Sequence, residues 1–482
     1  MGTSHQLDLA AGTLDIRNYS VAKTVTQTIN GKKVKVQTGW TLATNGATTL
    51  GRFGAKGLGI IGSTNALQDP TTVITGLTRI YTGQSDRGYG IPKDWTLKNL
   101  ILRFNGGSGY ILQAGETTVD TTTEIDNLTF TNVVFEGSHL GAVGGNGSLP
   151  WGLYLDIRSG NPGGIPDYLG LKMDGVKVTL TGQGLGVGKF NPANLPMTGG
   201  SAFLSTQGDT IKILNSLFDE SGYRNAITIA NSTNVLVSNN TFTRSSLYGN
   251  RYTGEKFVNV GGAITGNRFE HGSYLEFYDV NRVLAITGNV FDLSSCGGHA
   301  ILLRDVSNPN YALTASGNLD LSGNEFRGGL VARSEITAPS QLVLRSSSGA
   351  SNTVVVASGS YAFDRFLVGG IASDSLGVDG AMEKDWISGD VGNDTLTGGG
   401  GADAFVFATA PSSANIDSIT DFTPGTDNIW LDDNIYTGLT TGSFFGSQIN
   451  YDSATGALSY GAQAFATLSS GLTLTQSDFN LF

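Results

Sequence analysis

The chain has 482 residues, of which 39% are hydrophobic and 14% are charged, a composition too apolar and too weakly charged for a disordered protein. Its net charge of −11 argues against a nucleic-acid partner, and the lack of any run of about 18 apolar residues argues against membrane insertion. The single cysteine, Cys296, excludes an internal disulfide framework. At about 150 residues per domain, this length predicts two or three folded units.

A repeated ending marks the first part of the chain. Short strand-like segments end in Asn or Gly followed three residues later by Phe, at Asn132 and Phe135, Asn215 and Phe218, Asn239 and Phe242, Gly266 and Phe269, Gly288 and Phe291, and Gly323 and Phe326. The phenylalanines at 218, 242, 269 and 291 are 24, 27 and 22 residues apart. This period predicts an all-β fold, a right-handed parallel β-helix within residues 1–360, rather than a β-sandwich. Asn and Gly would adopt the left-handed corner, and Phe would stack inside.

Aligned turns of such a solenoid place charged side chains in one row. Strand alternation puts Leu275 and Phe277 inside and Glu276 and Tyr278 outside. The predicted outward row holds a cationic and phenolic strip, Arg158, Lys256, Tyr278 and Arg304. Such a strip on a nearly neutral domain predicts binding of a long anionic polymer, an acidic polysaccharide.

Residues 255–291 resemble the core of the β-helix polysaccharide lyases that cleave alginate. In that family a Lys on one turn is the base, and an Arg in an L-x-L-R-H-type strand of the next turn is the acid. Lys256 falls at the Lys position, whereas Tyr278 and Asp279 occupy the Arg and His positions. The resemblance covers fewer than 40 residues and implies cleavage by β-elimination.

The chemistry of elimination assigns roles to these residues. The proton beside a uronate carboxylate is removed only once that carboxylate is neutralised, so the site needs cations, a base and an acid. We expect Lys256 as base, Tyr278 as acid, and Arg304 or Arg224 against the carboxylate. The substrate-binding residues that we predict are Asp156, Arg158, Arg224, His271, Glu276 and His299.

Two other functions stay open. A glycoside hydrolase needs two carboxyl groups, for which Asp219 and Glu220 are the principal candidates. A non-catalytic polysaccharide-binding or surface protein would use the same rod without chemistry. The mannuronan epimerases are disfavoured because their Asp-Pro-His motif does not occur in the chain.

Residues 370–482, called the acidic segment below, carry the negative charge. They contain thirteen Asp, one Glu and one Lys, a net charge of −13, which leaves +2 for residues 1–369. Nine-residue stretches at 369–377, 380–388, 389–397 and 398–406 each have Asp at the sixth position and a large apolar residue at the eighth, Leu376, Ile387, Leu396 and Phe405. This is the pattern of a calcium β-roll, in which glycines form turns, carboxylates bind Ca²⁺ and apolar residues stack. The predicted calcium residues are Asp374, Asp385, Gly389, Asp390, Gly392, Asp394, Gly398, Gly400, Asp403 and Asp427.

These repeats and the segment after them, including residues 419–433 and 478–482, resemble the C-terminal parts of RTX (hemolysin-type repeat) proteins. The resemblance implies a calcium-binding β-roll over residues 361–482, export by type I secretion machinery through an uncleaved C-terminal signal, and an extracellular location. The start of the chain shows no basic-then-apolar signal peptide, which agrees with that route. The two predicted modules together resemble the rhizobial exopolysaccharide lyases.

Overall fold

The computed structural model describes residues 5–15, 24–29, 32–37, 58–77, 81–82, 95–105, 111–116, 126–138, 153–157, 169–181, 202–207, 210–219, 225–230, 232–243, 255–258, 260–271, 273–278, 280, 282–295, 298–304, 319–336, 341–345, 350–377, 382–439 and 444–482. Within these ranges the protein is all-β, as predicted, with one short 3-10 helix, η4 (Gln476–Asp478). No helix in the described part is long and apolar enough to cross a membrane. The chain divides into two compact units, residues 1–249 and 250–482.

The first unit consists of parallel ladders and one hairpin. Its strands are β1 (His5–Asp8), β2 (Gly12–Asp15), β3 (Thr24–Ile29), β4 (Lys32–Gln37), β5 (Leu58–Ile61), β6 (Thr72–Leu77), β7 (Tyr81–Thr82), β8 (Trp95–Asn105), β9 (Leu112–Glu116), β10 (Asp126–Ser138), β11 (Leu153–Ile157), β12 (Leu169–Asp174), β13 (Lys177–Thr181), β14 (Ala202–Gln207), β15 (Thr210–Leu214), β16 (Leu217–Asp219), β17 (Asn225–Ala230), β18 (Asn234–Ser238) and β19 (Thr241–Thr243). Strands β10, β12, β15 and β18 pair in parallel, as do β10, β13, β16 and β19. A third parallel ladder contains β7, β9, β11, β14 and β17, whereas β3 and β4 pair in antiparallel fashion.

The corner prediction is confirmed in this unit. Asn132, Asn215 and Asn239 have φ values of 53°, 50° and 56°, the left-handed conformation that Asn tolerates better than most residues. Three residues later the chain places Phe in the core, and the rings of Phe218 and Phe242 stack with centroids 5.2 Å apart. The corner residue therefore sets the bend that turns each Phe inward.

One turn of this unit has the corner of the repeated ending but Val in place of Phe. Gly175 is left-handed with a φ of 65°, and Val178 follows where other turns have Phe. Val178 lies in register between Phe135 and Phe218, so it belongs to the same column. Strand β14 accordingly lies between β11 and β17, a position that an alignment based on Phe alone leaves empty.

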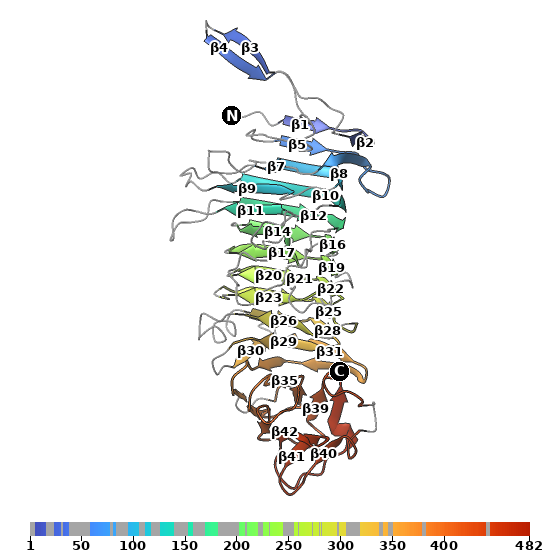
Figure 1. The fold of residues 1–482 in the computed structure, drawn as a ribbon, viewed down its shortest axis with the longest axis vertical. Helices are drawn as coiled ribbons and strands as arrows, with labels where there is room; N and C mark the ends of the chain where they lie inside the picture. Colours follow the sequence, from blue (N-terminus) through green and yellow to red (C-terminus); the bar gives the residue numbers. More distant parts are fainter. Residues whose placement is uncertain are drawn as a thin grey trace. The chain divides into compact units, whose positions relative to one another are not determined.

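The second unit continues with shorter strands. They are β20 (Glu255–Val258), β21 (Gly262–Thr265), β22 (Arg268–Glu270), β23 (Leu275–Tyr278), β24 (Leu284–Thr287), β25 (Val290–Asp292), β26 (His299–Leu303), β27 (Leu319–Ser322), β28 (Glu325–Arg327), β29 (Leu330–Ser334), β30 (Leu342–Arg345), β31 (Asn352–Val356), β32 (Gly359–Phe363), β33 (Arg365–Val368), β34 (Ser375–Gly377), β35 (Asp385–Ser388), β36 (Thr395–Thr397), β37 (Ala404–Phe407), β38 (Asp417–Ile419), β39 (Asn428–Leu431), β40 (Ile449–Tyr451), β41 (Ala457–Tyr460), β42 (Gln463–Thr467) and β43 (Phe479–Leu481). Up to β31, each repeat contributes one strand to each of three parallel ladders, one of which is β20, β23, β26 and β29 (Figure 1).

Buried asparagines hold the repeats of this unit together. The side-chain oxygen of Asn289 accepts hydrogen bonds from both the backbone N–H and the side-chain amide of Asn267, each at 2.9 Å. Asn289 donates in the same way to Asn324, which donates to Asn352. Because all four residues are at most 1% exposed, this ladder satisfies polar groups that would otherwise be costly to bury.

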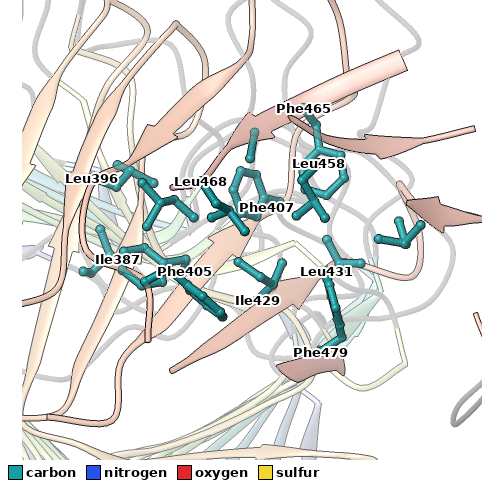
Figure 2. Close-up of a cluster of buried hydrophobic side chains, with 14 of the residues drawn as sticks. Ile387, Leu396, Phe405, Phe407, Ile429, Leu431, Leu458, Phe465, Leu468 and Phe479 are labelled. Atoms are coloured by element: carbon teal, nitrogen blue, oxygen red, sulfur yellow. The ribbon is translucent and has the colours of Figure 1, made fainter. Parts of the chain in front are cut away.

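The acidic segment forms two further parallel ladders. Strands β33, β35, β37, β39 and β43 form one, and β34, β36, β38 and β42 form the other, to which β41 and β40 add in antiparallel fashion. Leu376, Ile387, Leu396 and Phe405, the eighth residues of the nine-residue stretches, are all at most 1% exposed. They belong to one buried cluster with Ile429, Leu431 and other apolar residues (Figure 2), so the predicted apolar stack is confirmed. The predicted domain boundary at 360/361 lies inside the second unit and stays a prediction.

Candidate functional site

The predicted catalytic face lies on β23, β26 and their neighbours in the second unit. Glu276 is in register with Leu302, and the backbone N–H of Arg304 donates to the carbonyl of Phe277 at 2.9 Å. Parallel pairing thus brings Arg304 beside the end of β23, where Tyr278 lies. The structure therefore brings together Glu276, Tyr278 and Arg304, three residues that the sequence singled out.

Hydrogen bonds link these three side chains. The Tyr278 hydroxyl donates to Glu276 Oε1 at 2.6 Å, and Arg304 Nη1 lies 3.3 Å from the same oxygen. Burial, reinforced by the neighbouring Glu276 carboxylate, raises the pKa of Tyr278 well above its ordinary value. Tyr278 therefore keeps its proton throughout the neutral range.

A fourth residue, Glu335, completes the group, called the Glu276 cluster below. Arg304 Nε is 2.8 Å from Glu335 Oε2, and Nη2 donates to Oε1 at 3.0 Å. Burial lowers the pKa of Arg304, but the carboxylates of Glu276 and Glu335 outweigh this effect and raise it. Glu335 belongs to no repeat or motif in the sequence. Only the pairing of Leu303 with Ser334, the residue before Glu335, could have placed Glu335 near Arg304.

The cluster corrects the predicted solvent-facing strip in two respects. Glu276 is 0% exposed rather than outward in solvent, and its Oε2 has no hydrogen-bond partner among the described residues. Arg304 is 8% exposed and is already bound by two carboxylates. A carboxylate can be buried at this position because a cation and a phenol contact it, which strand alternation alone does not predict.

The remaining predicted catalytic and substrate residues are placed only in part. Lys256 lies on β20 in register with Glu276, and Asp156 lies on β11 in register with Gly115, but their side chains fall outside the described residues. Arg158, Arg224 and Glu220 also lie outside the described residues. Register therefore puts the backbones of Lys256 and Glu276 on adjacent strands of one ladder.

The structure places three further predicted residues, two histidines and one aspartate, at the ends or corners of strands. His271 is exposed at a left-handed corner with a φ of 53°. His299 begins β26, where its ring meets the edge of Tyr274 at 4.8 Å. Asp219 ends β16 in the first unit, in register with Thr243.

The acidic segment arranges its carboxylates in two columns. In the first column, the backbone N–H of Asp374 donates to Asp394 Oδ1 at 2.7 Å, and that of Asp394 donates to Asp417 Oδ1 at 3.1 Å. In the second column, Asp385 donates likewise to Asp403, and Asp403 to Asp427. Asp417 was missed by the nine-residue pattern, although Asp417 and Ile419 repeat its spacing of Asp and apolar residue.

These columns have the chemistry of a site for a hard cation. Burial and neighbouring carboxylates raise the pKa to about 7 for Asp403 and to about 8 for Asp417. Asp394 Oδ2 is buried and has no hydrogen-bond partner among the described residues. Buried carboxylates with raised pKa values are groups that a divalent cation would neutralise, so the chemistry of these oxygen donors, rather than their geometry, fits Ca²⁺. No group of three or more His, Cys, Asp or Glu side chains in the described ranges converges as a metal site.

The predicted glycines lie against these carboxylates. A Cβ on Gly389 would come within 2.2 Å of Asp394 Oδ2, and one on Gly398 within 2.4 Å of Asp403 Oδ2. Gly392 has a φ of 144°, and a Cβ there would meet the carbonyl of Ala372 at 2.4 Å. Side chains at these three positions would fill the space beside the aspartates, while Gly400 is partly buried in the stretch at 398–406.

Two predicted calcium residues have cationic partners instead. Asp385 forms a buried ion pair with Arg365, and Asp390 forms one with Arg333 at 2.9 Å. Burial raises the pKa of Asp385 although Arg365 lowers it, and burial likewise raises the pKa of Asp390 to about 6 against the effect of Arg333.

Comparisons with protein-family models and with curated proteins found no match to this chain.

Proposed function

We propose that this chain is a secreted, calcium-dependent enzyme that degrades an acidic, uronate-containing polysaccharide by β-elimination. Its architecture would be a right-handed parallel β-helix followed by an RTX-type β-roll. The observation that carries the proposal is Tyr278, a protonated phenol held by Glu276 and Arg304 on a ladder that also contains Lys256. The three parallel ladders with one strand per repeat support the β-helix.

The elimination follows from the roles of this chain's own residues. Lys256 removes the proton beside the uronate carboxylate, a double bond forms in the ring, and the bond to the glycosidic oxygen breaks. Tyr278 gives its proton to the departing oxygen. Tyr278 can act as the acid because its raised pKa keeps the phenol protonated before reaction. Arg304 then stabilises the phenolate, since its charge lies beside the Tyr278 and Glu276 pair.

The substrate carboxylate needs other cations in this proposal. Arg304 already contacts Glu276 and Glu335, so its charge is compensated within the protein. Arg158 and Arg224 stay the predicted partners of substrate carboxylates, and Asp156, His271 and His299 stay predicted contacts along the polymer.

Ca²⁺ has a structural role in the proposal. Asp374, Asp394, Asp403 and Asp427, together with turn carbonyl oxygens beside Gly389, Gly392, Gly398 and Gly400, would hold it. When bound, calcium neutralises the buried carboxylates and so stabilises the acidic segment. We also propose that residues 361–482 direct type I export, which a reporter fused to this segment and assayed in the medium of a host with a type I exporter would test.

A hydrolase is the second candidate, and one observation favours it. Arg304 lies between two carboxyl groups, those of Glu276 and Glu335, and hydrolysis of glycosides requires such a pair. Asp219 and Glu220 stay the other candidates for such a pair.

Product analysis distinguishes the functions. The protein is incubated with alginate, glucuronan, pectate and exopolysaccharide in the presence of calcium, and absorbance near 235 nm is recorded. A rise shows an unsaturated uronate and supports elimination. New reducing ends without that absorbance would establish hydrolysis instead. Retention on a polysaccharide column without either signal would establish a non-catalytic binder.

A further inference from the structure

Asp390 departs from the nine-residue pattern in a specific way. It occupies the second position of its stretch, where the next stretch has Gly399. Gly399 has a φ of 85° and Asp390 a φ of 67°, so a residue with a side chain adopts a conformation that favours glycine. The strain is offset by the ion pair between Asp390 Oδ2 and Arg333 Nε, at 2.9 Å, with the Asp390 side chain only 4% exposed.

Further contacts join the same two regions. The backbone N–H of Ile371 donates to the carbonyl of Ile336 at 3.0 Å. The Gln341 amide donates to the carbonyl of Gly377 at 3.0 Å and accepts from the Gly377 N–H at 3.3 Å. The first turns of the acidic segment are thereby bound to residues 333–341, which include the end of β29.

Glu335 directly follows the end of β29. Arg333 and Glu335 are two residues apart, so one short segment contacts Asp390 through the first and Arg304 through the second. Arg304 in turn contacts Glu276, which accepts the hydrogen bond from Tyr278. A continuous chain of polar contacts therefore runs from the acidic segment to the proposed acid.

We propose that Glu335 is a positioning residue that fixes Arg304 and Glu276, and that Asp390 docks the acidic segment onto β29 rather than binding calcium. Ordering of the β-roll by calcium then holds β29, and with it the orientation of the Tyr278 hydroxyl. This proposal rests on the proposed function for its catalytic consequence, but the docking itself is a property of the fold.

Asp390→Gly is the informative variant because it restores the glycine of the pattern, which suits the left-handed backbone, and removes the side chain that carries the carboxylate. At saturating calcium we expect hydrogen exchange of the amides of residues 330–336 to accelerate at least tenfold, while the calcium affinity measured by titration calorimetry falls no further than the loss of docking requires. Arg333→Met should give the same two results. Arg345→Met, an exposed arginine on the next strand β30, is the matched control and should change neither.

The outcomes separate docking from ligation. A calcium affinity at least tenfold lower in Asp390→Gly than in Arg333→Met would show that Asp390 is a ligand and overturn the docking role. Unchanged exchange at residues 330–336 in both Asp390→Gly and Arg333→Met would overturn the coupling. Hydrogen exchange and calcium titration do not depend on catalysis, so both measurements decide the docking role even if no substrate is cleaved.

Glu335 is tested on the active enzyme. Glu335→Gln keeps the size of the side chain and removes its charge, so we expect kcat to fall at least tenfold with KM within twofold. Glu335→Asp should recover part of the loss, because its carboxylate still pairs with Arg304. A rise in KM with unchanged kcat would instead place Glu335 in substrate binding and overturn the positioning role. Absence of turnover by the wild-type chain would count against the proposed function, while the exchange result would still decide the docking.

Discussion

The Arg365 guanidinium binds both carboxylate oxygens of Asp385, with Nε 2.7 Å from Oδ1 and Nη2 2.6 Å from Oδ2. Arg365 is 5% exposed and Asp385 is 0% exposed, so each charge depends on the other for its solvation. The pair joins β33 to β35, the first two strands of their ladder. In the degenerate stretch at 380–388, an arginine thus meets the carboxylate that the repeat pattern assigns to calcium.

Removal of one partner of this pair should destabilise the second unit. Arg365→Met leaves a buried carboxylate without its cation, and we expect the unfolding free energy to fall by about 3–5 kcal/mol. Urea denaturation followed by tryptophan fluorescence measures this, since Trp386 lies in register with Phe366. Arg268→Met is the control, because its side chain is 42% exposed and surface pairs contribute about 1 kcal/mol or less. Equal losses in the two variants would contradict the assigned role of Arg365.

Calcium removal should unfold the acidic segment selectively. Chelation leaves the −13 charge and the buried carboxylates uncompensated, so we expect residues from about 370 onward to lose amide protection while most earlier strands keep it. Calorimetry with and without EDTA should then show one transition that depends on calcium. A single transition unaffected by EDTA would show that the calcium β-roll is wrong.

Asp394→Asn tests the first column directly. Its Oδ2 is buried without a hydrogen-bond partner in the described part of the chain, so loss of its charge should weaken calcium binding by about tenfold or more. Asp433→Asn, at an exposed position, removes the same charge and should leave the affinity nearly unchanged. Calcium titration of both variants gives the comparison, and equal weakening would indicate only a general charge effect.

The acid and the base should each be essential for turnover. Tyr278→Phe and Lys256→Ala are expected to lower kcat by about 10² or more, the usual scale of general acid–base catalysis. Tyr278→Phe retains the ring and thus isolates the hydroxyl. Asp219→Asn is the control and should keep full activity. If that variant were inactive while the first two remained active, elimination by Lys256 and Tyr278 would be refuted.

Tyr278 should remain a phenol at alkaline pH. Burial and the Glu276 carboxylate raise the pKa of Tyr278, and a raised acid pKa means that the proton is lost only at higher pH. Spectrophotometric titration at 295 nm between pH 9 and 11 should therefore be the same for the folded wild type and folded Tyr278→Phe. In the unfolded state the variant should titrate one tyrosine fewer than the 16 of the wild type. A missing signal in the folded variant would show that Tyr278 titrates normally.

The sequence allowed the periodic parts of this fold to be predicted because their causes are local. A left-handed corner needs Asn or Gly, as at Asn215 and Gly266, and the residue three positions later then points inward. Val178 does not match the sequence pattern, because the buried column that contains Phe135 requires an apolar side chain but not Phe itself. The coarse all-β, parallel character was therefore predictable, while one strand, β14, was not.

The candidate site was less predictable because its contacts are long-range. Strand alternation predicts that Glu276 points to the face opposite to Phe277. The complete burial of Glu276, however, depends on its contacts with Arg304 and Tyr278. Glu335 comes 31 residues after Arg304 and has no pattern of its own. Ion pairing between separate repeats follows from register, which a single sequence does not reveal.

The carboxylate columns give the acidic segment a polarity. The backbone N–H of each aspartate is satisfied by the side chain of the following turn, as Asp374 is by Asp394 and Asp385 by Asp403. If the following turn is not yet folded, the buried backbone N–H of the aspartate therefore has no acceptor. If the preceding turn is not yet folded, only one carboxylate oxygen loses its donor, and water can replace that donor. Each turn is thus a template for the one before it in sequence. We expect the segment to form from its C-terminal end toward β33, so that its last turns order first and its first turns, which contact residues 333–336 and 341, order last.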